Sequence, residues 1–242
     1  MNIYEIKVLL SVHVGNEKLV LNNAGGKKLT DSNDYFVVTD DGNCYLFDAN
    51  GIEKDISAIT TLTEDIISND IKKIVIPDSV TSIEENAFSD CSNLMSVTIG
   101  NGVTSIGDYA FSDCDDLTNV TIPNSVTSIG RSAFASCSGL KSVTIGNSVM
   151  SIGRWAFYNC SSLMSVTIPD SVTNIEHSAF VGCSGLKSVM IPNSVTSIES
   201  LALYGCSGLT NVTFEGKTLE EVQLMQNYPF GIKDESIIKC IE

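Results

Sequence analysis

Apolar and polar residues follow a pattern along residues 71–214 that repeats every 23 residues. In one period the apolar positions are Leu117, Val120, Ile122, Val126, Ile129, Ala133, Phe134 and Cys137, and nearly the same segment begins again at Leu94, Leu140, Leu163 and Leu186. A fixed period of this length is typical of solenoids, in which one coil stacks on the next. Because a single coil cannot bury its apolar residues, the coils must stack until rows of like residues form one continuous core.

Each period predicts two extended segments and a turn. The run Leu94, Val97, Ile99 alternates with Ser and Thr, which is the pattern of a strand with one buried face. A shorter extended piece follows, such as residues 125–129 in the next period. The segment from Gly107 to Cys114 then has the spacing of about one helical turn, which lets Phe111 fill the core.

The residues before the repeat have a different pattern. Residues 1–57 predict a small N-terminal β module, with strands at residues 6–14 and 18–22 and a hairpin at residues 35–48 whose turn contains Asp41 and Gly42. Residues 58–70 are interpreted as a degenerate cap in which Thr63 begins a helical turn, and together with the repeat they form a solenoid segment of residues 58–214.

Residues 215–242 predict a C-terminal cap made of a helix and a strand. Thr218 and Glu221 have the spacing of a capping box, which opens an amphipathic helix with Leu219, Val222 and Met225 on one side. The last residues, SIIKCIE, predict a final strand that covers the open end of the core.

Six of the eight cysteines occupy a single position of the repeat, namely Cys91, Cys114, Cys137, Cys160, Cys183 and Cys206. Side chains in register point the same way, which strains the torsion of a disulfide, so buried free thiols are the favoured interpretation. A disulfide pair and a metal row are the alternatives. No short-spaced ligand motif accompanies the row, and we predict no metal site and no cofactor. Cys44 and Cys240 are interpreted as small core residues.

The charge of the chain bears on its partners and location. A net charge of -15 argues against nucleic acid, because binding to phosphates depends on Lys and Arg. No stretch approaches the roughly 20 apolar residues of a membrane-spanning helix, so we expect no membrane insertion. The N-terminus lacks a basic leader and a cleavage site, which favours a cytoplasmic or virion-associated location over secretion.

The motif I-x-x-x-A-F-x-x-C-x-x-L recurs six times and resembles the leucine-rich repeats of the BspA-like, or Treponema pallidum, type. The resemblance covers residues 71–214 and departs from the pattern at Leu201 and Leu203. It implies a right-handed solenoid with a parallel β-sheet on one face and turns or short helical segments on the other. It also implies a role in adhesion or protein binding.

No group of residues points to catalysis. The chain has two histidines, His13 and His177, and neither lies in a motif of catalytic residues. A Ser-His-Asp site assembles from distant residues, so spacing alone does not decide the question, and His177 is the residue to test. We therefore predict no catalytic residues.

Two surfaces are candidates for binding. On the sheet face, the outward rows are Ser96, Asn119, Ser142, Ser165, Ser188 and Asn211, and beside them Thr98, Thr121, Thr144, Thr167, Met190 and Thr213. Such hydroxyl rows are similar to the flat arrays of ice-binding solenoids, although small residues that favour strands explain them as well.

The second surface consists of positions that differ from coil to coil, because the core does not dictate them. There the candidate binding residues are Tyr109, Arg131, Arg154, Trp155, Tyr158 and His177. Equivalent positions lie about 5 Å apart in a stacked array, which predicts one basic and aromatic patch. Arg, Trp and Tyr dominate the residues that contribute most to binding at interfaces. Ordinary variation in a solvated loop is the alternative.

These patterns predict a non-enzymatic, adhesin-like scaffold for recognition of a protein or glycan partner. The alternatives are a component of a bacteriophage virion, an intracellular interaction module and, least favoured, an enzyme. The oligomeric state stays open.

Overall fold

The computed structural model describes residues 80–241, Asp78 and the strands β1 to β6. Strands β1 (Lys27–Lys28), β2 (Tyr35–Val38), β3 (Cys44–Phe47) and β4 (Glu53–Lys54) form a four-stranded antiparallel sheet in that order. The predicted hairpin is confirmed, since β2 and β3 pair with Tyr35 opposite Phe47. The strands predicted at residues 6–14 and 18–22, and the helical turn at Thr63, lie outside the described residues.

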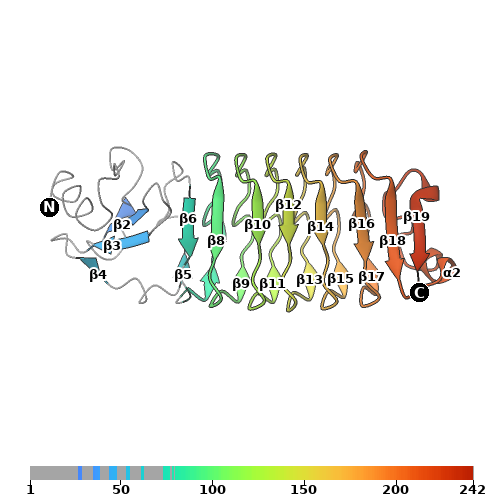
Figure 1. Cartoon of the computed structure of the whole chain (residues 1–242), viewed down its shortest axis with the longest axis horizontal. Coiled ribbons are helices and arrows are strands. Elements are labelled where there is room, and N and C mark those ends of the chain that lie inside the picture. The colour runs from blue at the N-terminus through green and yellow to red at the C-terminus, as the bar shows by residue number, and fades with distance from the viewer. Residues whose placement is uncertain are drawn as a thin grey trace.

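The repeat forms a solenoid of parallel strands, which stack side by side along one axis (Figure 1). One row contains β6 (Lys73–Ile76), β8 (Ser96–Ile99), β10 (Asn119–Thr121), β12 (Ser142–Thr144), β14 (Ser165–Thr167), β16 (Ser188–Ile191) and β18 (Asn211–Glu215). The second row contains β5 (Thr61–Leu62), β7 (Ser82–Ile83), β9 (Ser105–Ile106), β11 (Ser128–Ile129), β13 (Ser151–Ile152), β15 (Asn174–Ile175) and β17 (Ser197–Ile198). The pairings within both rows are parallel, as the repeat predicts, and Val120 lies opposite Val143.

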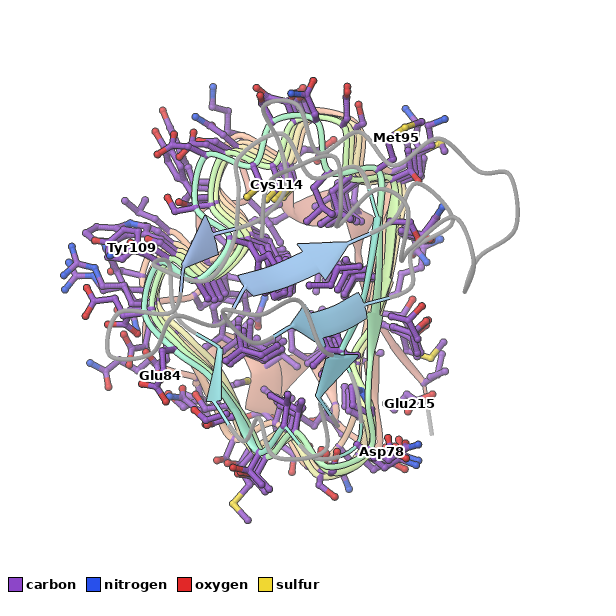
Figure 2. All side chains as sticks on the ribbon, turned by 90° about the vertical axis from the view of Figure 1, so that its left-hand side faces the viewer. Asp78, Glu84, Met95, Tyr109, Cys114 and Glu215 are labelled. Carbon is purple, nitrogen blue, oxygen red and sulfur yellow. The ribbon has the colours of Figure 1, made fainter. Side chains whose placement is uncertain are left out.

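The core is a set of columns, one for each apolar position of the repeat. Each column stacks identical or similar side chains, which Figure 2 shows superimposed along the axis of the solenoid. The phenylalanine column contains Phe88, Phe111, Phe134, Phe157 and Phe180, with ring centroids 4.8 to 5.5 Å apart and planes within 8° of parallel. The spacing of the rings is therefore set by the spacing of the strands, about 4.8 Å.

Opposite the longer strands, the chain forms turns, and we call this side the turn face. Here the N–H groups of Tyr109, Phe111 and Asp113 donate to carbonyls of the following coil at 2.7 to 2.8 Å. Because alternate N–H groups bond across coils instead of along the chain, the helical turn expected at residues 107–114 does not form. The backbone is left-handed at Tyr109 and at Asp113, with φ of 56° and 58°.

The cysteine column is buried and its thiols are free, as predicted. Each thiol from Cys114 to Cys206 donates to the carbonyl of a phenylalanine on the preceding coil, at 3.0 to 3.2 Å. Burial raises the pKa of the Cys137 and Cys160 thiols. The neighbouring thiol, followed by burial, raises the pKa of Cys114 and of Cys183.

The C-terminal cap begins with the short helix α2 (Leu219–Gln223), and the predicted capping box is present. The backbone N–H of Thr218 donates to the Glu221 carboxylate at 2.7 Å, which lowers the pKa of that group. Val222 is buried, but Leu219, which the sequence places on the same side of the helix, is not. Its side chain is 46% exposed, because a five-residue helix buries only one side chain here.

The cap ends with the 3-10 helix η2 (Glu235–Ile237) and the strand β19 (Ile238–Ile241). β19 pairs in parallel with β18, so the predicted final strand is confirmed. The coil with the departures at Leu201 and Leu203 packs normally, since Leu203 is 4% exposed and its N–H donates to the carbonyl of Phe230 in the cap.

We expect Phe134→Ala to lower the free energy of unfolding by about 3 to 5 kcal/mol, because it leaves a cavity in the middle of the stacked column. Denaturant unfolding measures this loss. The control is Met150→Ala, whose side chain is 63% exposed and whose replacement should change stability by no more than about 0.5 kcal/mol. Equal effects of the two substitutions would contradict the assigned core.

We expect the thiols of Cys114, Cys137, Cys160 and Cys183 to resist alkylation in the native protein, because only the thiolate reacts and their pKa values are raised. Peptide mapping after brief labelling measures this protection. Labelling in denaturant, where all eight cysteines should react, is the control. Native labelling at any of the four would contradict the prediction.

Candidate functional site

One column of the turn face combines a left-handed backbone with side chains that vary from coil to coil. It contains Asn86, Tyr109, Ser132, Trp155, Ser178 and Leu201, whose φ angles lie between 54° and 61°. The left-handed conformation costs an ordinary residue about 1 to 2 kcal/mol, and only Gly, Asn and Asp adopt it readily. Asn86 is therefore the residue that the fold favours here, whereas Tyr109 and Trp155 are costly. Leu201 carries the same cost in the same column.

The two aromatic rings of this column lie beside the only two arginines of the chain. The guanidinium carbon of Arg131 is 5.7 Å from the ring centroid of Tyr109 and 4.6 Å from that of Trp155. The guanidinium carbon of Arg154 is 4.2 Å from the same Trp155 ring. These are cation–π distances. Trp155 is also the only tryptophan, so the rarest residue types of the sequence are in contact at one place.

Carboxylates of neighbouring coils accept from the backbone at three successive positions of the patch, Arg131, Arg154 and His177. The N–H of Arg131 donates to Asp108 at 2.7 Å, and the N–H of Arg154 donates to Glu176 at 3.0 Å. These contacts fix where the side chains of Arg131, Arg154 and His177 leave the coil, which makes this part of the surface rigid. We call Tyr109, Arg131, Arg154, Trp155, Tyr158 and His177 the turn-face patch.

His177 continues the patch on the next coil. Its ring meets Trp155 edge-on, with centroids 6.1 Å apart and an interplanar angle of 67°. Its Nδ1 lies 2.7 Å from the Ser200 hydroxyl, which resembles a base beside a nucleophile. Within residues 80–241, however, no carboxylate hydrogen-bonds the other ring nitrogen, and the Glu199 side chain accepts from the His177 backbone N–H at 3.0 Å. The pair therefore lacks the orienting group of a triad.

Next to the arginines the turn face contains a groove of about 420 Å³. It is lined by Tyr109, Ser112, Asp113, Ser132, Ala135, Ser136, Trp155 and Tyr158. Figure 2 shows Tyr109 pointing outward from the turn face, away from the core. The groove exists because Ser132 is small: it occupies the column between Tyr109 and Trp155, so the two rings stand apart as walls.

The structure thus brings all six predicted residues into one patch and adds a groove that the sequence did not reveal. The missed lining residues are small or polar, and three of them, Ser112, Ser132 and Ala135, are buried. One signal in the sequence could have found the groove: the order Tyr, Ser, Trp in successive repeats places a gap between two rings. The aromatic residues of the lining, Tyr109, Trp155 and Tyr158, are those that the sequence had already indicated.

The sheet face is more uniform. Its threonine rows border a hollow of about 520 Å³ over β8, β10 and β12, where Thr98, Thr121 and Thr144 are exposed. The prediction that Thr213 continues this exposed row was wrong, since it is 7% exposed and accepts a hydrogen bond from Asn211. The structure therefore offers a regular hydroxyl surface on one side and a patch of distinct residues on the other.

The described residues contain no cluster of three or more His, Cys, Asp or Glu side chains that could hold a metal ion. In the same part of the chain, no helix is both long and apolar enough to cross a membrane.

The model of the BspA type leucine rich repeat region matches residues 67–160 and 104–230, with six copies of the repeat. The chain belongs to this family. No curated protein matches it. An array of BspA type repeats is a scaffold for protein interaction or recognition, and solenoids of this kind are typically not enzymes.

Two solved structures support the assignment to the BspA type. The leucine rich repeat protein of T. pallidum (TpLRR) is 32% identical, with a TM-score of 0.51 over 56% of this chain and 64% of that one. A leucine rich cell surface protein of Faecalibacterium prausnitzii is 28% identical, with a TM-score of 0.55 over 71% of this chain and 55% of that one. The chain thus spans less than two thirds of the length of either protein.

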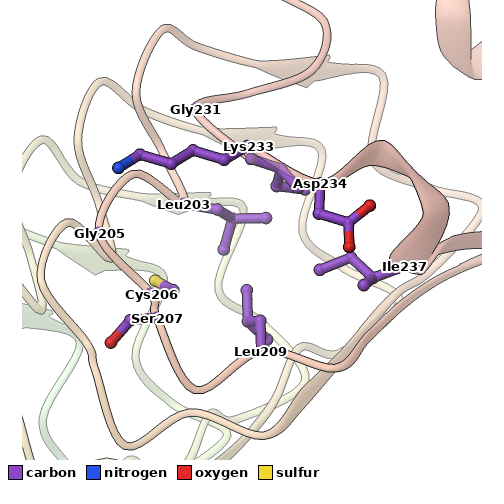
Figure 3. Close-up of a pocket in the computed structure, with 10 residues that line it drawn as sticks. Leu203, Gly205, Cys206, Ser207, Leu209, Gly231, Lys233, Asp234 and Ile237 are labelled. Atoms are coloured by element: carbon purple, nitrogen blue, oxygen red, sulfur yellow. The ribbon is translucent and has the colours of Figure 1, made fainter.

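A second cavity, of about 290 Å³, lies where the last BspA type coil meets the cap (Figure 3). Leu203 lines it at the position that phenylalanine occupies in the five preceding coils, and Leu209 and Ile237 add further apolar surface. Lys233 and Asp234 border it. We interpret this cavity as a packing defect between the last coil and the cap, which differ in sequence and do not fit together as two coils do.

We expect Trp155→Asn to change the free energy of unfolding by less than about 1 kcal/mol. Relief of the left-handed strain, about 1 kcal/mol, offsets the loss of exposed cation–π contacts worth about 0.5 to 1 kcal/mol each. Thermal or denaturant unfolding measures it. The matched comparison is Phe157→Ala, two residues along the same BspA type coil, which should cost about 3 to 5 kcal/mol. Similar losses in both variants would show that Trp155 serves stability.

Proposed function

We propose that the protein is an adhesin-like recognition module that binds a protein or glycan ligand at the turn-face patch. The observation that carries the proposal is that Tyr109 and Trp155, both at left-handed positions that cost stability, cluster with the two arginines of the chain, whereas Leu201 at the equivalent position does not. A residue type that costs stability persists when function requires it. The same two rings contact both arginines and border a groove.

The composition of the patch supports binding rather than ordinary surface variation. Trp, Tyr and Arg are enriched among the residues that contribute most to binding, and here they occur together on a chain with a net charge of -15. Two guanidinium groups on such a surface provide local attraction for electron-rich groups of a ligand. The carboxylate contacts to the backbone make the patch rigid before binding, which reduces the entropy lost on association.

The adhesin-like part of the proposal draws on a relative. The similar protein of F. prausnitzii is described as a leucine rich cell surface protein, and by analogy this chain would present its patch to an external ligand. A virion surface would present it equally well. The location expected from the sequence, cytoplasmic or virion-associated, remains a prediction.

The test is binding of the purified protein to arrays of immobilised glycans and extracellular proteins. We expect Arg154→Ala combined with Trp155→Ala to weaken binding to any ligand found by at least about 30-fold, since loss of one such residue costs about 2 kcal/mol or more. Surface plasmon resonance on the retained ligand measures the change, and circular dichroism checks that the fold is intact.

The matched control alters the other face. Thr121→Lys combined with Thr144→Lys places two charges on the exposed strands β10 and β12. This variant should bind as the unmodified protein does. If it loses binding while the turn-face variant retains it, the sheet face is the site and the proposal is wrong.

A further inference from the structure

The groove of the turn-face patch has the size and composition of a small-ligand site. Its volume of about 420 Å³ falls within the range of about 300 to 1,000 Å³ that is usual for such sites. Tyr109 and Trp155 are two coils apart, so their rings stand roughly 10 Å from each other at a coil spacing of about 4.8 Å. Tyr158 adds a third ring, and the floor between them is formed by Ser132 and Ala135.

The polar groups of the groove are available to a ligand. The Ser132 residue is 5% exposed and its hydroxyl hydrogen-bonds to no other group within residues 80–241, but the oxygen keeps access to solvent at the groove. A ligand in the groove can therefore exchange hydrogen bonds with this hydroxyl in place of water. The Asp113 carboxylate likewise has no hydrogen-bond partner among residues 80–241, and it borders the same groove.

The charges in and beside the groove decide which ligand it fits. Asp113 is the only ionised side chain in the lining, and it can only accept hydrogen bonds. The arginines are not part of the lining, but the Arg131 guanidinium lies between the Tyr109 and Trp155 rings and the Arg154 guanidinium lies against Trp155, so both charges are engaged with rings at the edge of the groove. A carboxylate or sulfate placed against Asp113 would meet a group of its own sign. Adjacent hydroxyls of an uncharged ligand could instead donate to Asp113 in charge-assisted bonds.

We propose that this groove binds an uncharged saccharide. The inference rests on the proposed function, because it assigns a ligand class to the same site. The apolar C–H face of a sugar ring packs against Tyr158 or the edges of Tyr109 and Trp155, while its hydroxyls donate to Asp113 and exchange hydrogen bonds with Ser132 and Ser136. Arg131 and Arg154 are positioning residues in this arrangement, since they hold the Trp155 ring.

The sole tryptophan of the chain provides the measurement, because Trp155 is itself a wall of the groove. The probes are neutral saccharides, namely lactose, cellobiose, maltose, mannobiose and diacetylchitobiose, with sialyllactose and cellobiouronic acid as their anionic counterparts. We expect at least one neutral saccharide to change the Trp155 emission saturably, with a dissociation constant on the order of 1 mM. Its anionic counterpart should bind at least about tenfold more weakly.

Two variants test the polar contacts, each with a matched control at the same repeat position. Asp113→Asn keeps the shape and tolerates the left-handed backbone, and it should weaken the neutral saccharide about tenfold. The control Asp90→Asn, at φ of 60° one coil earlier and outside the lining, should have no effect. Ser132→Ala should weaken binding about fivefold, whereas Ser178→Ala, equally buried but outside the groove, should leave it unchanged.

Three results would overturn the inference. The first is no saturable change in Trp155 emission with any neutral saccharide up to roughly 50 mM. The second is tighter binding of an anionic saccharide or an acidic peptide, strengthened by Asp113→Asn because a like charge is removed. The third is equal effects of Asp113→Asn and Asp90→Asn.

These failures are distinguishable from failure of the proposed function. If the turn-face double variant loses a protein ligand while no saccharide perturbs Trp155, the patch remains the binding site and only the ligand class is wrong. If the sheet-face variant loses the ligand, both proposals are wrong.

Discussion

A single coil of this chain can satisfy neither its apolar side chains nor its backbone, and the whole structure depends on that constraint. The N–H groups of the strands and of the turn face bond to neighbouring coils, so hydrogen bonding requires stacking in register, as burial of the apolar side chains does. Because every coil has 23 residues, register carries each side chain onto its equivalent in the next coil. The phenylalanine and cysteine columns follow from this register, and the thiols add a hydrogen bond between coils.

This constraint also explains which features could be predicted from the sequence. Each column of apolar residues in the structure is seen in the sequence as an apolar residue that recurs every 23 positions. The solenoid, the parallel pairing and the buried thiols could therefore be predicted. The C-terminal strand and the Thr218 capping box follow from local patterns that do not depend on the coils. The exposure of Leu219 could not be foreseen, because it depends on where a five-residue helix stops and which side meets the last coil.

The left-handed positions were beyond the reach of the sequence pattern. Residues 107–114 have the spacing of a helical turn, and only the bonds to the following coil impose a different backbone. Once that backbone is known, the sequence has a new meaning: Asp, Asn and Gly at positions such as Asp113 and Gly182 satisfy it, whereas Tyr109 and Trp155 do not. The candidate residues were found from their variation, but the groove was not, because Ser132 contributes to it through its small size.

The exact register of the coils also determines which positions of the surface are free to vary. Most positions of the coil are committed to columns, and on the exposed strands small residues that favour extended structure recur from coil to coil. The turn face can vary, since its backbone is fixed by hydrogen bonds that any residue except proline can make. At Trp155 the residue is one that the left-handed backbone disfavours, at a cost to stability of about 1 kcal/mol or more. A stack of nearly identical coils thus holds one irregular surface in place, where aromatic and basic side chains gather although the backbone does not favour them.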